Sequence, residues 1–270
     1  MRFKHRGLAL QKRIPDTYTM ELIAGVFGLA LGSFINVLID RLPRGESVLF
    51  VRSHCDSCHR TLSWFELVPV FSYLVQHGRC RRCRAKLSLQ YPVIEIVTAL
   101  LVIMLYRAVG GNAIAGIVYG LIGLSLFVIF VADLKYTTIP DSMVVVGAIG
   151  AVAERMLPGS MRSAPLLPLV FSALGGALFL LLIYGATRGR GMGFGDVKLA
   201  LLLGVLSGYP GIVVTLAAAF LTGAGAGVIL ILIGKKTLKS HVPFGPFLIA
   251  GQIISLVWGE TIVAWWKGIL

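Results

Sequence analysis

Long apolar runs separated by short polar stretches dominate this sequence. The first run covers residues 20–39, and seven more follow a polar segment at 40–92: 93–109, 113–132, 142–157, 166–186, 197–208, 211–234 and 244–266. About 20 apolar residues let a helix cross a bilayer, and an unpaired backbone group in lipid costs several kcal/mol, so spanning segments must be helical. The pattern predicts an all-α polytopic membrane protein with about eight transmembrane helices, of which 197–208 is the weakest.

Composition supports this class. The 270 residues are 57% hydrophobic and 14% charged, with a mean hydropathy of +0.86, whereas soluble proteins carry about 25% charged residues. A soluble enzyme, a secreted disulfide scaffold and a disordered chain are excluded. The net charge of +13 does not indicate nucleic-acid binding, because membrane proteins collect basic residues in cytoplasmic loops and no basic recognition element is present.

The basic residues predict the orientation. If the polar segment is cytoplasmic and the runs alternate, sixteen Lys and Arg residues lie inside and four outside, apart from five in the N-terminal tail. This is a positive-inside pattern. The tail places its charges on the opposite side, so either the dense loop outweighs it or translation begins at Met20. The expected parts of the chain are a basic tail (1–19), a first transmembrane helix (20–39), a cytoplasmic four-cysteine domain (40–92) and a transmembrane core (93–270).

All four cysteines lie in the polar segment. Cys55 and Cys58 form one C-x-x-C pair, and Cys80 and Cys83 form a second after 21 intervening residues. This spacing suits a structural tetrahedral Zn²⁺ site, which would stabilise a segment that has little apolar core. Two disulfides are the alternative, but they need an oxidising compartment. No internal repeat is evident.

Two aspartates stand at the ends of apolar runs, on the predicted cytoplasmic side. Asp133 follows the run 113–132, and Asp196 follows Gly193 and Gly195 at the start of another run. Two carboxylates that meet in a low dielectric share one proton. An aspartic hydrolase works in this way: one carboxylate takes a proton from water and the protonated one polarises the scissile carbonyl. The two glycines leave room for a substrate backbone.

Other interpretations of these acids remain open. Each aspartate is alternatively a helix-boundary acid, an assignment that suits Asp141, because it follows Pro140 where a carboxylate favours the helix dipole. A cation-coupled transporter also uses membrane carboxylates, and an inactive assembly scaffold is a third hypothesis. Pro243 and Gly245 belong to an irregular segment at membrane depth, which is either a substrate-facing loop or a broken helix entry.

Together these motifs resemble the bacterial prepilin peptidases (type IV leader peptidases) of the GxGD class of intramembrane aspartic proteases. The resemblance runs in order through nearly the whole chain from Gly32. The matching segments are 32–37 followed by 41–43, then 52–55, 78–83, 91–95, 133–141, 193–198 and 243–246.

The resemblance implies an activity and a location. Such enzymes cut the leader from type IV prepilins or type II secretion pseudopilins after a glycine, at the cytoplasmic face of the bacterial inner membrane. By motif position, Asp133 and Asp196 form the catalytic pair and the four cysteines bind zinc. The resemblance also implies methylation of the new N-terminus with S-adenosylmethionine. No Rossmann-type glycine fingerprint marks a donor site, so its residues are unassigned, and the cytoplasmic loop around Gly78 is where we expect it.

Overall fold

A computed structural model describes residues 17–48, 50–157, 166–234 and 242–269. Within these residues the fold is helical, and β-pairing is limited to isolated bridges. The eight longer helices are α1 (Thr17–Arg41), α3 (Gln90–Ala108), α4 (Ala113–Tyr136), α5 (Asp141–Glu154), α6 (Leu166–Ala186), α7 (Phe194–Ser207), α8 (Gly211–Leu232) and α9 (Gly245–Ile269). The polar segment holds the short helix α2 (Phe71–Val75) and the 3₁₀ turns η1 (Leu42–Arg44) and η2 (Trp64–Leu67). Most of the predicted N-terminal tail lies outside the described residues.

Every predicted apolar run forms a helix, and the all-α polytopic class is confirmed. The count of about eight spans is not, because six helices in the described parts of the chain are long and apolar enough to cross a membrane. The other two, α5 and α7, have 14 residues each, or about 21 Å of helix. Hydropathy marks the apolar run but not where its helix stops. In α7 the stop is Gly208, with a φ of +64°.

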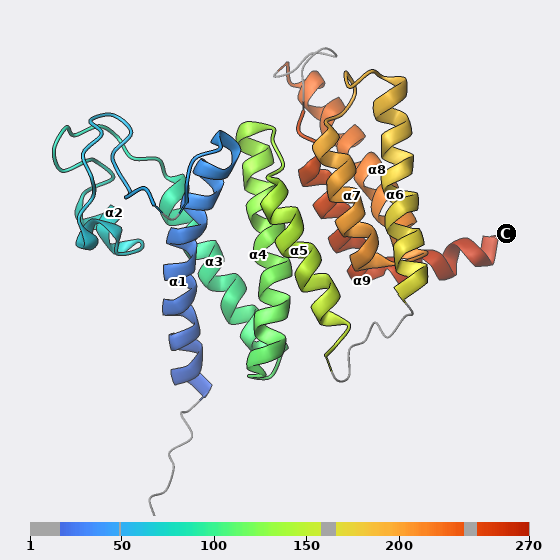
Figure 1. Ribbon diagram of the computed structural model, residues 1–270, viewed down its shortest axis with the longest axis horizontal. Helices are drawn as coiled ribbons and strands as arrows, with labels where there is room; N and C mark the ends of the chain where they lie inside the picture. Colours follow the sequence, from blue (N-terminus) through green and yellow to red (C-terminus); the bar gives the residue numbers. More distant parts are fainter. Residues whose placement is uncertain (1–16, 49, 158–165, 235–241, 270) are drawn as a thin grey trace, which may run out of the picture.

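The helices pack mainly as pairs of sequence neighbours (Figure 1). α1 packs along α3, α4 along α5, α6 along α7, and α8 along α9. The helices alternate in direction, and the cysteine-containing segment extends from the end of α1 on one side of the bundle (Figure 1). α5 and α9 also contact α7, and α9 contacts α4, so that α4 and α7, which carry the two aspartates, are drawn toward one another.

The α1–α3 pair depends on glycine. A Cβ on Gly32 would lie 2.5 Å from the Cα of Glu95, and one on Gly28 would lie 2.6 Å from the Cα of Ala99. The two glycines are one helical turn apart, so they form one surface on which the α3 backbone rests. Small residues at such positions allow close helix packing in membranes.

We expect Gly32→Ala to lower the stability of the protein, because the added methyl group forces α1 and α3 apart. Overpacking of this kind costs about 1–3 kcal/mol. The measurement is the thermal unfolding midpoint in detergent, with Gly123→Ala as the matched control, since a Cβ at Gly123 meets nothing within 4 Å. Equal midpoints for the two variants would contradict the close packing.

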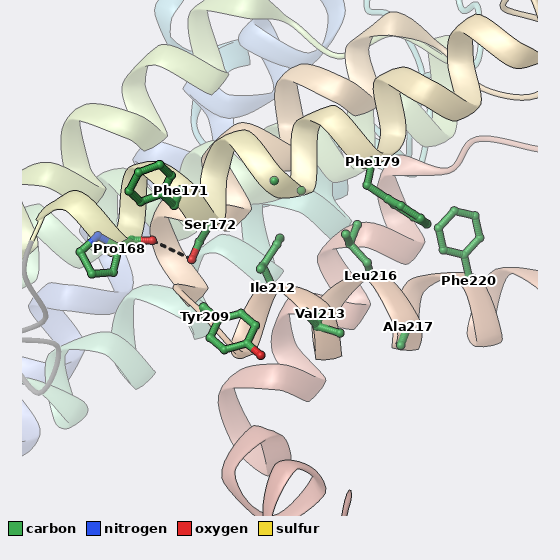
Figure 2. Close-up of a pocket in the computed structure, with 12 residues that line it drawn as sticks. Pro168, Phe171, Ser172, Phe179, Tyr209, Ile212, Val213, Leu216, Ala217 and Phe220 are labelled. Carbon is green, nitrogen blue, oxygen red and sulfur yellow. Dashed lines mark hydrogen bonds between the residues drawn. The ribbon is translucent and has the colours of Figure 1, made fainter. Parts of the chain in front are cut away.

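α6 and α8 border an apolar groove of about 660 Å³ (Figure 2). Its lining includes Phe171 and Phe179 from α6 and Val213 and Phe220 from α8, and none of the described residues that line it is charged. Such a surface suits acyl chains or an apolar helix and offers nothing to a charged ligand.

Candidate active site

Asp133 and Asp196 line one cavity, although 62 residues separate them in the sequence. Asp133 lies in the last turn of α4 and Asp196 in the first turn of α7. Each residue is 5% exposed. The cavity has a volume of about 770 Å³ and a mixed polar and apolar lining. The structure therefore brings together the two carboxylates that the sequence singled out.

Backbone N–H groups hold both carboxylates in place. The N–H of Gly193, the residue before α7, donates to Asp196 Oδ2 at 3.0 Å. The N–H of Gly245, the first residue of α9, donates to Asp133 Oδ2 at 3.0 Å. One oxygen of each carboxylate is therefore fixed, which leaves the other to meet water or substrate. The sequence did not indicate the contact between Gly245 and Asp133, because it joins segments 112 residues apart.

The predicted substrate-approach residues lie around this cavity in different ways. Gly193 and Pro243 line it, and a Cβ on Gly193 would meet nothing nearer than 3.6 Å. Gly195 also lines it, but its Cβ would lie 3.1 Å from the Cβ of Ile139. Gly195 thus lets α7 pack against the segment between α4 and α5. Approach of a substrate to these residues stays a prediction.

We expect Gly245→Ala to slow the reaction of this cavity about 10-fold to 100-fold, since a misplacement of about 1 Å at a reacting group has an effect of that size. The added Cβ would lie 2.7 Å from Asp133 Oδ2 and would push the carboxylate away. Turnover at saturating substrate is the measurement. Gly225→Ala is the control, because a Cβ there meets nothing within 4 Å. If both variants turn over like the unmodified protein, Gly245 does not position Asp133.

The rim of the cavity carries an ion pair that sequence reasoning missed. Lys198 Nζ lies 2.7 Å from Asp141 Oδ1, and both residues line the cavity. Asp141 begins α5 directly after Pro140, as predicted for a helix-boundary acid. The pair is largely exposed, with side-chain exposures of 35% and 68%, so its effect on stability is small. Asp141 and Lys198 belong to the same two sequence segments as the aspartates, 133–141 and 193–198. That shared placement was the signal from which the ion pair could have been predicted.

The four cysteines form one cluster. Their sulfur atoms all lie within 4.8 Å of one another, and Sγ of Cys55 and Sγ of Cys83 are 3.9 Å apart. A tetrahedral zinc site with Zn–S bonds of about 2.3 Å has sulfur atoms about 3.8 Å apart. The cluster therefore fits one metal ion better than two separate disulfides. Backbone N–H groups of Cys83 and Arg82 lower the pKa of the Cys80 thiol to about 6, whereas burial and the neighbouring sulfur atoms raise the pKa of Cys83 to about 11. Of these two cysteines, the shift favours the thiolate that a metal needs at Cys80.

The two cysteine pairs are copies of one backbone motif. The N–H of Cys55 bonds to the carbonyl of Arg60 at 3.0 Å, and the N–H of Cys80 bonds to that of Ala85 at 2.9 Å. Short bridges close both turns: His54 with Thr61, and Arg79 with Lys86. The expectation of no internal repeat was wrong. The repeat is visible in the sequence as Cys-x-x-Cys-x-x-x-Leu at 55–62 and 80–87. The repeated unit is short because it consists of one turn and contains no apolar core.

Comparison with known proteins assigns the family. A model of the bacterial peptidase A24 N-terminal domain matches residues 26–109, and one of the type IV leader peptidase family matches residues 120–228. The prepilin leader peptidase/N-methyltransferase of Bacillus subtilis is 35% identical over 262 residues, which cover 92% of this chain and 98% of that protein. This chain belongs to the type IV leader peptidase family. The proteins of that name from Aeromonas salmonicida and Legionella pneumophila are 31% and 30% identical, over 89% and 92% of this chain and 91% and 95% of their own lengths. No solved structure matches it.

Membership of the type IV leader peptidase family confirms the resemblance and makes the chain a protease of a multi-pass bacterial membrane family. The two matched regions contain different features of the structure. The first covers most of α1, the cysteine cluster and α3, whereas the second contains both aspartates.

Proposed function

We propose that this peptidase removes the leader of type IV prepilins or type II secretion pseudopilins, with Asp133 and Asp196 as its catalytic pair. The observation that carries this assignment is the burial of both carboxylates in one cavity of a leader-peptidase fold. Such a pair shares a proton, so that the ionised carboxylate activates water and the protonated one polarises the scissile carbonyl.

The residues around the pair have separate tasks in this proposal. The N–H groups of Gly193 and Gly245 hold one oxygen of each carboxylate at 3.0 Å, so neither side chain has to reorganise when substrate arrives. Gly193 leaves the wall of the cavity open for an extended substrate backbone. Phe194 and Phe244 supply apolar surface in the lining.

The site faces the cytoplasm in this proposal. The supporting observation is the positive-inside bias of the loops, together with the hydrogen bond that Arg44, near the start of the cysteine domain, donates to the hydroxyl of Tyr136 at 3.1 Å. Tyr136 ends α4, one turn beyond Asp133. The cysteine domain and the aspartate cavity therefore share one side of the bundle, and a basic leader would be cut there, after a glycine.

We assign two further groups to the protein. Zinc is the metal that suits a four-cysteine cluster of these dimensions, and its role is structural because four thiolates leave no open position. S-adenosylmethionine is the methyl donor, since the relatives carry N-methyltransferase in their names. The donor supplies a methyl group to the N-terminus that leader cleavage exposes.

Ion-coupled transport is the competing hypothesis, because membrane transporters also bury carboxylates. The test is incubation of the purified protein in vesicles with a type IV prepilin, a type II secretion pseudopilin and S-adenosylmethionine, followed by mass spectrometry. We expect loss of the leader and then the mass gain of one methyl group. Intact substrates together with a proton or cation flux across the vesicles would overturn the peptidase assignment.

A further inference from the structure

A second cavity, of about 480 Å³, lies between the cysteine domain, α1 and α3. The cysteine domain contributes Cys55 and Cys80 to its lining, so the metal cluster forms part of one wall. Asn36 of α1 and Glu95 of α3 line the side nearest the bundle. The peptidase reaction uses none of these residues.

We propose that this cavity binds the methyl donor S-adenosylmethionine, and that Asn36, Asp40 and Glu95 are binding residues for it. The inference rests on the proposed N-methyltransferase activity and assigns it a site separate from the aspartate cavity. Its volume lies in the range of small-molecule sites, which are about 300–1,000 Å³.

The chemistry of the lining matches the parts of the donor. The donor carries a sulfonium cation, a ribose diol, an adenine ring and an amino-acid end with its carboxylate. Asp40 and Glu95 place carboxylates in the lining. Asp40 Oδ1 is paired with Lys135 Nζ at 2.7 Å and Glu95 Oε2 accepts the N–H of Val70 at 2.7 Å, so a cation or a diol would meet carboxylates that are already held in place. Tyr73 and Tyr91 provide aromatic surface for adenine. The guanidinium of Arg44 lines the same cavity and suits a carboxylate.

An unpaired acceptor marks the binding face independently. Asn36 is 4% exposed, and its side-chain nitrogen donates to the carbonyls of Gly32 at 3.3 Å and Tyr91 at 3.1 Å. These bonds fix the amide, yet its oxygen Oδ1 has no hydrogen-bond partner among the residues that the structure describes. A buried acceptor without a partner destabilises the protein, because it has lost its bonds to water and gained none in return. A ligand with N–H or O–H groups, such as the adenine amine or the ribose hydroxyls of S-adenosylmethionine, would satisfy this oxygen.

Gly78 helps to shape the same cavity. Gly78 has a φ of +63°, and a Cβ there would lie 2.7 Å from the hydroxyl of Tyr73. Gly78 therefore lets the ring of Tyr73 take its place in the cavity wall. The expectation from the sequence, that the donor site involves the loop around Gly78, acquires a physical basis in this contact.

The two cavities are neighbours across the end of α1. Asp40 and Arg44 line the second cavity, whereas Leu42 lines the aspartate cavity. Tyr136, three residues beyond Asp133 in α4, donates its hydroxyl hydrogen to Asp40 Oδ1 at 2.9 Å. A new N-terminus released beside Asp133 would have a short path to the donor, which explains how one chain carries out both reactions in sequence.

The test is equilibrium binding of radiolabelled S-adenosylmethionine to the purified full-length protein without prepilin. Ser72→Trp fills the cavity from α2, and Leu74→Trp is its matched control, because Leu74 lies on the same short helix but is 64% exposed and outside the lining. We expect Ser72→Trp to weaken binding at least about tenfold and Leu74→Trp to leave it unchanged. Metal content and the unfolding midpoint of each variant report folding.

Two milder variants keep the proposal falsifiable if Ser72→Trp does not fold. Asn36→Leu removes the unpaired acceptor and Glu95→Gln removes the charge, and each should weaken binding several-fold, on the order of a lost hydrogen bond to a buried group. Asp196→Asn should bind the donor as the unmodified protein does, even though it does not cleave.

Three results would overturn the site. One is unchanged donor binding in folded Ser72→Trp, or in both milder variants. Another is loss of binding in Asp196→Asn, which would move the donor to the aspartate cavity. The third is a protein that cleaves prepilin but binds no donor. Failure to cleave while the donor still binds in a Ser72-dependent manner would count against the peptidase proposal alone.

Discussion

Asp133→Asn and Asp196→Asn should each reduce the rate of leader cleavage by at least about 10³-fold, the scale of a lost general acid or base. Asparagine has the size of aspartate and keeps an oxygen for the N–H of Gly245 or Gly193, so the cavity should keep its shape. It can neither take a proton from water nor donate one to the scissile carbonyl. The measurement is the initial rate of leader loss from a prepilin, followed by mass.

Glu260→Gln is the matched control for these variants, because it removes an exposed carboxylate on α9, away from the cavity. It should cleave at the unmodified rate. All three variants should share the unfolding midpoint of the unmodified protein. A folded asparagine variant that keeps more than about a tenth of the rate would show that its aspartate has no essential role, since general acid–base catalysis contributes about 10²–10⁴-fold.

Removal of the metal should unfold the cysteine domain and leave the helical bundle intact. Structural zinc sites contribute about 10–16 kcal/mol in small peptides, and the segment between α1 and α3 has little apolar core of its own. We expect a strong chelator to speed trypsin cutting in this segment by at least about 100-fold, because local opening free energy sets proteolysis. Gel and mass analysis of the fragments locates the cuts at the basic residues between positions 52 and 86: Arg52, Arg60, Arg79, Arg81, Arg82, Arg84 and Lys86.

The same digestion separates the two hypotheses for the cysteines. Protection that is lost with chelator and restored by added Zn²⁺ supports the metal site. Protection that resists chelator but is lost with a reducing agent would instead establish disulfides. Fragments from the transmembrane helices should not change under either treatment, and their appearance would mean that the whole protein had unfolded.

Hydropathy alone predicted where the helices lie, because lipid allows few alternatives for an apolar segment. The bounds of α5 and α7 were not predictable in the same way. They depend on local backbone features, such as the positive φ of Gly208, that an apolar count does not detect. The six-span result follows from these helix ends and not from a change in fold class.

The candidate site was predictable in its residues but not in its geometry. Asp133 and Asp196 were conspicuous because charged side chains at membrane depth are costly. Contacts between distant segments left no local pattern, so the hydrogen bond from Gly245 to Asp133 was not foreseen. The packing of Gly195 against Ile139 is of the same kind. The donor cavity is assembled from α1, α3 and the cysteine domain, and therefore has no linear motif.

The central claim is that one chain holds both catalytic carboxylates in one cavity. Its most direct test is a cleavage assay in which the unmodified protein, Asp133→Asn, Asp196→Asn and an equal mixture of the two variants act on the same prepilin. The account predicts leader loss with the unmodified protein and none with either variant or with their mixture, because neither molecule contains a complete pair. Cleavage by either variant, or its recovery in the mixture, would contradict it.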